Sequence, residues 1–140
     1  MATATNELIT WSDRYSVGIA NIDREHQKLV AMVNQLYTAI LSGEAPAVAS
    51  KVLDGLAGYT MSHFANEEAL MKRYNYPGYA QHKAEHDKLV DQVRQFQSDL
   101  RAGKAKLSQD LMSFLQGWLI GHILGVDKKY TIHLHGAGVK

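Results

Sequence analysis

Hydrophobic positions along this chain recur with the period of amphipathic helices. Apolar residues are spaced by three and four over residues 22–40, 53–74, 79–100 and 112–126, which places each set on one helical face. Strict strand alternation is absent, and β-branched residues are sparse. The pattern predicts four helices and no sheet.

The breaks between these apolar stripes predict short links. Pro46 follows a Ser-Gly-Glu-Ala sequence, Pro77 is followed by Gly78, and Gly103 stands where a helix C-terminus is expected. Ser108 then offers an N-cap for the last helix. Four amphipathic helices with short links favour an all-α fold, an antiparallel up-down-up-down four-helix bundle with an N-terminal arm.

Length and composition are those of one folded domain. The chain has 140 residues, of which 46% are hydrophobic and 21% are charged. We therefore expect a single domain over residues 1–140, with an arm at 1–20, the bundle at about 21–130 and a tail at 131–140. A formal net charge of +1 gives no electrostatic reason to expect nucleic acid as a partner. No apolar run approaches the roughly 20 residues of a membrane helix and no secretory signal is evident, so we expect a cytoplasmic protein without membrane insertion.

Histidine interrupts every one of the four apolar stripes. The interrupting polar residues, together with the aspartate that follows the fourth stripe, are His26, His63, Glu67, His82, His86, His122 and Asp127. One histidine on an apolar face is commonly a hydrogen-bonded core residue. Burying imidazoles on all four faces together with a carboxylate costs several kcal/mol unless something compensates. The recurrence therefore indicates a shared site.

The bundle topology brings these seven residues to one end. Those of the first and third stripes lie early in their helices, and those of the second and fourth lie late. At about 1.5 Å of rise per residue, all of them lie within roughly 6–18 Å of the same end. His122 and Asp127 are five residues apart, about 140° round a helix, so we expect the helix to end or distort there, a π-bulge being one possibility.

The residue types point to a pair of metal ions. The chain has no cysteine, so any metal is held by nitrogen and oxygen. Five imidazoles and two carboxylates are too many ligands for one ion and suit two, and nitrogen-rich sites favour iron, copper or zinc over magnesium or calcium. If both carboxylates and one oxygen atom bridge two six-coordinate ions, one position stays open for a small ligand.

Four segments around these residues resemble the hemerythrins, specifically the bacterial single-domain members. The segments lie at 17–26, 63–68, 82–89 and 118–130, and the resemblance covers nearly the whole chain. The set of seven ligands in this order is its specific part. The resemblance implies reversible dioxygen binding for oxygen storage, delivery or sensing by a protein that is not an enzyme. Dioxygen is then the ligand, and an oxygen-consuming enzyme is a candidate partner.

The resemblance also implies a role for each ligand. One non-haem iron ion would take His82, His86 and His122, and the other would take His26 and His63. The carboxylates of Glu67 and Asp127 would bridge the two ions, together with an oxo or hydroxo group. Dioxygen would bind at the second iron, whose open side would be walled by apolar residues that exclude water and proton donors. These are Leu29, Phe64, Trp118, Leu119 and Ile123.

Several residues near these positions have a structural interpretation. We expect Glu25 and Glu68 to face solvent rather than to orient imidazoles, and Tyr130 to pack against the core. His133 and His135 match no ligand position and are expected in a solvated tail.

Three glycines share one face of the fourth helix, because Gly117, Gly121 and Gly125 recur every four residues. Each costs roughly 1 kcal/mol relative to alanine in a helix interior. Such a face suggests a close approach by the arm or by another subunit, and we hypothesise that the arm packs against it.

Two other functions stay open at this point. The first is a diiron enzyme that acts on peroxide or nitric oxide, although no general acid or base is evident among the residues of the apolar wall. The second is an iron store or sensor without oxygen chemistry. Metal content and colour distinguish these functions.

Overall fold

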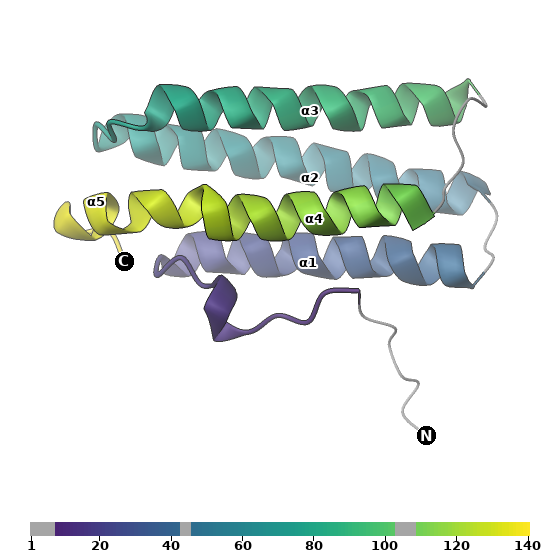
Figure 1. Ribbon diagram of the computed structural model, residues 1–140, viewed down its shortest axis with the longest axis horizontal. Coiled ribbons are helices and arrows are strands. Elements are labelled where there is room, and N and C mark those ends of the chain that lie inside the picture. Colours follow the sequence, from purple (N-terminus) through teal and green to yellow (C-terminus); the bar gives the residue numbers. More distant parts are fainter. Residues whose placement is uncertain (1–7, 43–45, 103–108) are drawn as a thin grey trace.

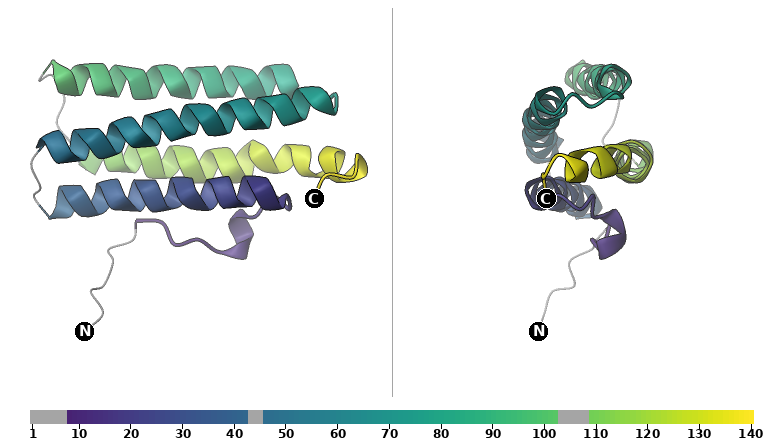
Figure 2. Two further views of the ribbon diagram at one scale, coloured as in Figure 1. Left: turned by 180° about the vertical axis from the view of Figure 1, so that it is seen from behind. Right: turned by 90° about the vertical axis from the view of Figure 1, so that its left-hand side faces the viewer.

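A computed structural model describes residues 8–42, 46–102 and 109–140. For residues 46–49 and 109–111 it describes the backbone alone. Four long helices lie side by side along the molecule and alternate in direction (Figures 1 and 2). They are α1 (Ala20–Leu41), α2 (Pro46–Arg73), α3 (Tyr79–Arg101) and α4 (Gln109–Gly125). The predicted all-α, antiparallel four-helix bundle is confirmed.

The apolar stripes of the sequence form the core between the helices. On α1 the buried positions include Ile22, Leu29, Val33 and Leu36, with His26 among them. Burying one such aliphatic side chain contributes about 1.5–3 kcal/mol, so each helix is held chiefly by this face. Within the described ranges, no helix is both long enough and apolar enough to cross a bilayer.

The helix ends follow the breaks in the sequence. Proline fits at the first position of α2 because an N–H group at that position has no partner within the helix, so its absence costs no hydrogen bond. After α2 the chain turns through Asn75, whose φ of 55° is left-handed, before Pro77 and Gly78 lead into α3. The predicted cap Ser108 and the predicted helix end near Gly103 lie outside the described residues.

Helix α4 stops just before Asp127. It ends at Gly125, and a 3-10 turn, η2 (Asp127–Tyr130), follows. The expected end of the helix before Asp127 is therefore present, and it is this turn rather than a π-bulge that redirects the chain. The change of direction carries the Asp127 side chain into the core, where it is fully buried.

The arm before α1 packs along the bundle. It contains the short turn η1 (Asp13–Tyr15) and is fastened to α1 by Asn34, whose side-chain oxygen accepts the backbone N–H groups of Leu8 and Ile9 at 2.9 and 3.0 Å. At the start of α1, the carboxylate of Asp23 accepts the N–H of Val17 at 2.8 Å. These bonds fix the approach of the chain to the first helix.

The segment after Tyr130 is not the solvated tail expected from the sequence. It forms α5 (Thr131–Gly136), in which Leu134 is fully buried in the core. The Thr131 hydroxyl donates to the carbonyl of Val17 at 2.7 Å. Burial of one leucine and this bond to the arm hold the segment in place.

Both histidines of α5 are hydrogen-bonded; His133 is half-buried, which corrects its assignment to a solvated tail, whereas His135 is exposed to solvent as expected. The His133 ring donates to the carbonyl of Tyr74 at 2.6 Å, and the His135 ring donates to the carbonyl of Gly18 at 2.7 Å. Gly18 has a φ of +73°, and a Cβ there would lie 2.8 Å from the His135 ring. This position therefore requires glycine for both its backbone conformation and its close neighbour.

The described part of the arm, residues 8–19, does not pack against the glycine face of α4, contrary to our hypothesis. Gly117, Gly121 and Gly125 are exposed, and apart from chain neighbours and the backbone of α4 itself, no atom of the described structure lies within 4 Å of a Cβ built on any of them. The arm instead contacts α4 through Gln116, whose side chain donates to the carbonyl of Leu8 at 3.3 Å. Gln116 lies to one side of the glycine face, so the described part of the arm does not cover that face.

Candidate metal centre

The seven candidate ligands meet in the core near one end of the bundle. They come from all four long helices and from η2, and none is more than 6% exposed. Their donor atoms form two groups, each with all its atoms within 4.8 Å of one another. One group holds Glu67, His82, His86, His122 and Asp127, and the other holds His26, His63, Glu67 and Asp127. Both carboxylates therefore belong to both groups.

The Asp127 carboxylate faces histidines of both groups. Its Oδ1 lies 2.9 Å from Nε2 of His82 and 2.9 Å from Nε2 of His122. Its Oδ2 lies 3.0 Å from Nε2 of His26. The two oxygens of one carboxylate thus point to different groups, which is the arrangement of a bridging ligand.

The Glu67 carboxylate also lies between the groups. Its Oε1 is 3.3 Å from Nε2 of His63 and 3.2 Å from Nε2 of His86. These two histidines belong to different groups. Glu67 and Asp127 therefore link the same two sets of imidazoles.

The donor atoms fit metal ions better than they fit one another. Both Asp127 oxygens, Oε1 of Glu67 and Nε2 of His26, His63 and His82 are buried without a hydrogen-bond partner in the described part of the chain. Buried polar atoms without partners are costly. Metal–ligand bonds of about 2.0–2.2 Å place ligands at right angles about 3 Å apart, which matches the spacings above. Five imidazoles and two carboxylates without a thiol suit iron or a similar transition metal.

The surrounding imidazoles favour the ionised form of both carboxylates, which is the form that binds a metal. Burial raises the pKa of Asp127, but His122 and the other imidazoles outweigh burial and hold it well below its usual range. Burial and the charge of Asp127 raise the pKa of Glu67, but His63 and His86 outweigh them and lower it.

Glu25 and Glu68 orient two of the imidazoles, which corrects the expectation that they face solvent. Oε1 of Glu25 accepts the Nδ1–H of His63 at 2.6 Å, and Glu68 accepts the Nδ1–H of His86 at 2.9 Å. The two carboxylate side chains are only 23% and 20% exposed. A proton held on Nδ1 leaves Nε2 free to bind a metal, so both bonds select the useful tautomer.

The charge of Glu25 is stabilised by the groups it contacts. Its second oxygen accepts a hydrogen bond from the Asn66 side chain at 2.9 Å. Burial raises the pKa of Glu25, but the bonds from His63 and Asn66 outweigh burial and lower it. Glu25 is therefore an ionised acceptor, which increases the electron density of the His63 ring.

The sequence suggested that Tyr130 only packs against the core. In the structure it is fully buried there and also contacts two of the candidate ligands. Its hydroxyl donates to Oε2 of Glu67 at 2.6 Å, and its ring stacks on that of His82 with centroids 5.6 Å apart. Burial and the charges of Glu67 and Asp127 hold the pKa of the Tyr130 hydroxyl well above its usual range. The tyrosine therefore keeps its proton and fixes the carboxylate.

All five residues expected in the apolar wall are buried. Phe64 stacks on His86 with ring centroids 3.8 Å apart, and its ring lies 6.2 Å from that of Trp118. The other three, Leu29, Leu119 and Ile123, belong to the same apolar core. An apolar cluster therefore adjoins the imidazoles.

The comparisons with known proteins agree with this architecture. The family model described as the Hemerythrin HHE cation binding domain matches residues 17–131. The chain is 38% identical over 124 residues to the bacteriohemerythrin of Stenotrophomonas maltophilia (strain R551-3), covering 89% of this chain and 80% of that one. It is 31% identical over 124 residues to the myohemerythrin of Riftia pachyptila, covering 89% and 92%.

The fold is also similar to that of a solved structure. The crystal structure of a wild-type hemerythrin aligns with a TM-score of 0.86 and 37% sequence identity, over 91% of this chain and 98% of that one. Sequence and fold agree over most of the chain. This chain therefore belongs to the hemerythrin family.

Proposed function

We propose that the seven buried residues bind two iron ions and that the protein binds dioxygen reversibly at this pair. Hemerythrins are known for dioxygen binding at a diiron site. The observation that carries the proposal is that two groups of donor atoms share both carboxylates, because bridging carboxylates are needed only where two ions lie side by side.

The two groups differ in their number of imidazoles. His82, His86 and His122 would hold one ion, and His26 and His63 would hold the other, with Glu67 and Asp127 common to both groups. The ion with two imidazoles would have one protein ligand fewer, so a small ligand would bind there. The bound iron pair supplies the electrons and the free coordination position that reversible dioxygen binding requires.

Other residues of the chain hold the ligands in place. Glu25 and Glu68 fix the tautomers of one histidine from each group, His63 and His86. Tyr130 fixes Glu67 through its hydroxyl. Ligands fixed before the metal binds lose less conformational freedom on binding, so the metal is held more tightly.

The surroundings favour an oxygen carrier over an enzyme. The buried core includes the proposed wall of Leu29, Phe64, Trp118, Leu119 and Ile123, which offers no carboxylate or imidazole as an acid or base. The nearby Tyr130 proton is committed to Glu67 and is held by a raised pKa. Low access for protons and water slows irreversible oxidation of the metal.

Metal analysis combined with absorption spectra tests the function. The protein is reduced without air, exposed to oxygen and then placed under vacuum. Two irons per chain, with visible bands that appear with oxygen and vanish under vacuum, are the expected result. Irreversible oxidation with substrate turnover would instead identify an enzyme acting on peroxide or nitric oxide. A colourless zinc protein would identify a metal store or sensor.

Histidine variants test the ligand assignment. His63→Ala and His122→Ala each remove a proposed ligand from a different ion, so both should lower the iron content and destabilise the bundle. His133→Ala is the matched control, because this histidine contacts the Tyr74 carbonyl and lies outside both groups. Unchanged iron stoichiometry in the two ligand variants would contradict the assignment.

A further inference from the structure

A small pocket at the surface meets one of the proposed ligands. It has a volume of about 90 Å³ and lies between the start of α3 and the end of α4, near η2. Its lining includes His82 together with Gln81, Glu85, Val126 and Lys129. Of these, Gln81, Glu85 and Lys129 are exposed, whereas His82 is 3% exposed. Solvent at this mouth is therefore separated from the centre by the His82 ring.

In the described structure, Nδ1 of His82 lacks the hydrogen-bond partner that Nδ1 of His63 and of His86 has. Nδ1 of His26 is also without a partner in the described structure, but His26 does not line the pocket. Nε2 of His82 lies 2.9 Å from Asp127, so this edge of the ring faces the centre. Its Nδ1 is buried and has no hydrogen-bond partner in the described structure, unlike Nδ1 of His63 and His86. Stacking on Tyr130 tolerates rotation of the ring better than a hydrogen bond does. His82 is therefore freer to turn than the two histidines held by carboxylates.

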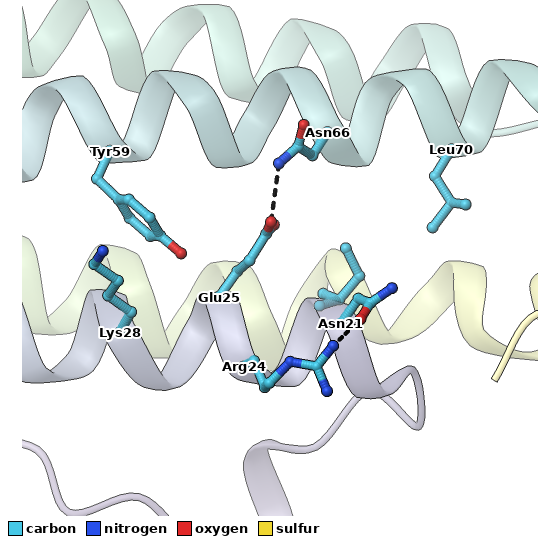
Figure 3. A pocket seen from close by; sticks show the side chains of 8 residues that line it. Asn21, Arg24, Glu25, Lys28, Tyr59, Asn66 and Leu70 are labelled. Carbon is cyan, nitrogen blue, oxygen red and sulfur yellow. Dashed lines mark hydrogen bonds between the residues drawn. The ribbon is translucent and has the colours of Figure 1, made fainter.

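A larger groove on the surface of the bundle does not reach any of the proposed metal ligands. It lies between α1 and α2, has a volume of about 520 Å³, and is lined by Arg24, Glu25 and Lys28 among others (Figure 3). None of the seven proposed ligands lines it. Its link to the centre is closed by Glu25, which is bonded to both His63 and Asn66. The ammonium and guanidinium groups there also repel a cation.

The apolar side of the centre is a poor path for an ion. The proposed wall residues are at most 8% exposed, and moving a hydrated cation through apolar side chains carries a large desolvation cost. A polar mouth that ends on a ligand avoids most of this cost.

We propose that metal ions enter and leave the centre through the pocket over His82, with Glu85 attracting the cation and the His82 ring turning to pass it inward. The proposal rests on the assignment of His82 as an iron ligand. Glu85 also offsets the ammonium of Lys129, which lines the same mouth.

The test compares the rates of metal exchange in variants altered at the pocket and at the groove. Release of metal from the loaded full-length protein to a chelator is measured first. Uptake of Co²⁺ by the metal-free protein is then measured by the increase in visible absorption. Gln81→Trp obstructs the pocket, Glu85→Gln removes its carboxylate, and Asn21→Trp adds similar bulk to the groove between α1 and α2 as the matched control.

A route alters the barrier for exchange and not its end states. Gln81→Trp should therefore slow uptake and release by the same factor, about tenfold, and leave the affinity and the stoichiometry of two unchanged. Glu85→Gln should slow uptake by about three- to tenfold at low salt, and the difference should shrink at high salt. Asn21→Trp should leave both rates unchanged.

Two results would overturn this route. One is parent-like uptake and release in both Gln81→Trp and Glu85→Gln, and the other is slowing by Asn21→Trp instead. Glu85→Gln changes almost no volume, so it tests the route even if Gln81→Trp perturbs α3. A parent protein that binds fewer than two metal ions would instead contradict the proposed function, which keeps the two failures distinguishable.

Discussion

The hydrogen bond from Tyr130 to Glu67 can be tested by removing a single atom. Tyr130→Phe deletes the hydroxyl that donates to Oε2 of Glu67 at 2.6 Å and leaves the ring that stacks on His82. Both residues are fully buried, so water does not replace the lost donor easily. A hydrogen bond to a charged group contributes about 1.5–3 kcal/mol net, and the variant should lose stability on that scale.

The size of the thermal effect follows from the length of the chain. An unfolding entropy of about 2.1 cal/mol/K per residue gives about 0.3 kcal/mol/K for 140 residues, so the midpoint should fall by about 5–10 °C. Thermal unfolding of the metal-free protein, followed by circular dichroism, measures this shift. Tyr76→Phe is the control, because it removes the same atom from a ring that packs edge-on against Tyr130. Equal midpoints for Tyr130→Phe and the parent would refute the role given to this bond.

Three other changes test the site and its surroundings. Glu25→Ala removes the hydrogen-bond acceptor of the His63 ring, so it should weaken metal binding about 10- to 100-fold, measured in competition with a chelator. Glu25→Gln should lose less affinity. Equal affinities for both variants and the parent would argue against an orienting role. Leu119→Ala, at a position 2% exposed, should cost about 2–5 kcal/mol in urea unfolding and speed autoxidation in air, and a slower rate would count against the proposed wall. Gly121→Ala should raise stability in urea by up to about 1 kcal/mol, since no atom of the described structure beyond the local helix backbone lies within 4 Å of the added methyl. A loss of stability would reveal a contact on that face.

The helices and the clustering of the candidate ligands could be predicted because both depend on spacing along the chain. The apolar period specifies which face of each helix is buried, and an antiparallel order places early and late positions at the same end. His26, His63, His82 and His122 therefore had to approach one another once the bundle formed. The clustering of all seven predicted residues in the structure follows from these two regularities.

The partners of the ligands depend on how neighbouring helices pack. Glu25 adjoins His26 in the sequence but bonds to His63, and Glu68 adjoins Glu67 but bonds to His86 on the next helix. Adjacent residues on a helix point about 100° apart, so these side chains leave the core face and lie at the boundary with the next helix. Whether such a side chain turns inward or toward solvent depends on interhelical geometry that periodicity does not specify.

The arm, the last segment and the glycine face show the same limit. The stripe of Gly117, Gly121 and Gly125 marks a surface that could accept a close neighbour, yet the described part of the arm contacts α4 at Gln116 and does not cover that surface. The last segment has too few apolar residues for a periodic signal, and its position depends on one buried leucine, Leu134, and on bonds to residues more than one hundred positions earlier. Local spacing predicts the helices and the end of the bundle where the ligands meet, because those contacts repeat along the chain. Single long-range contacts do not repeat, so they become visible only when the chain is folded.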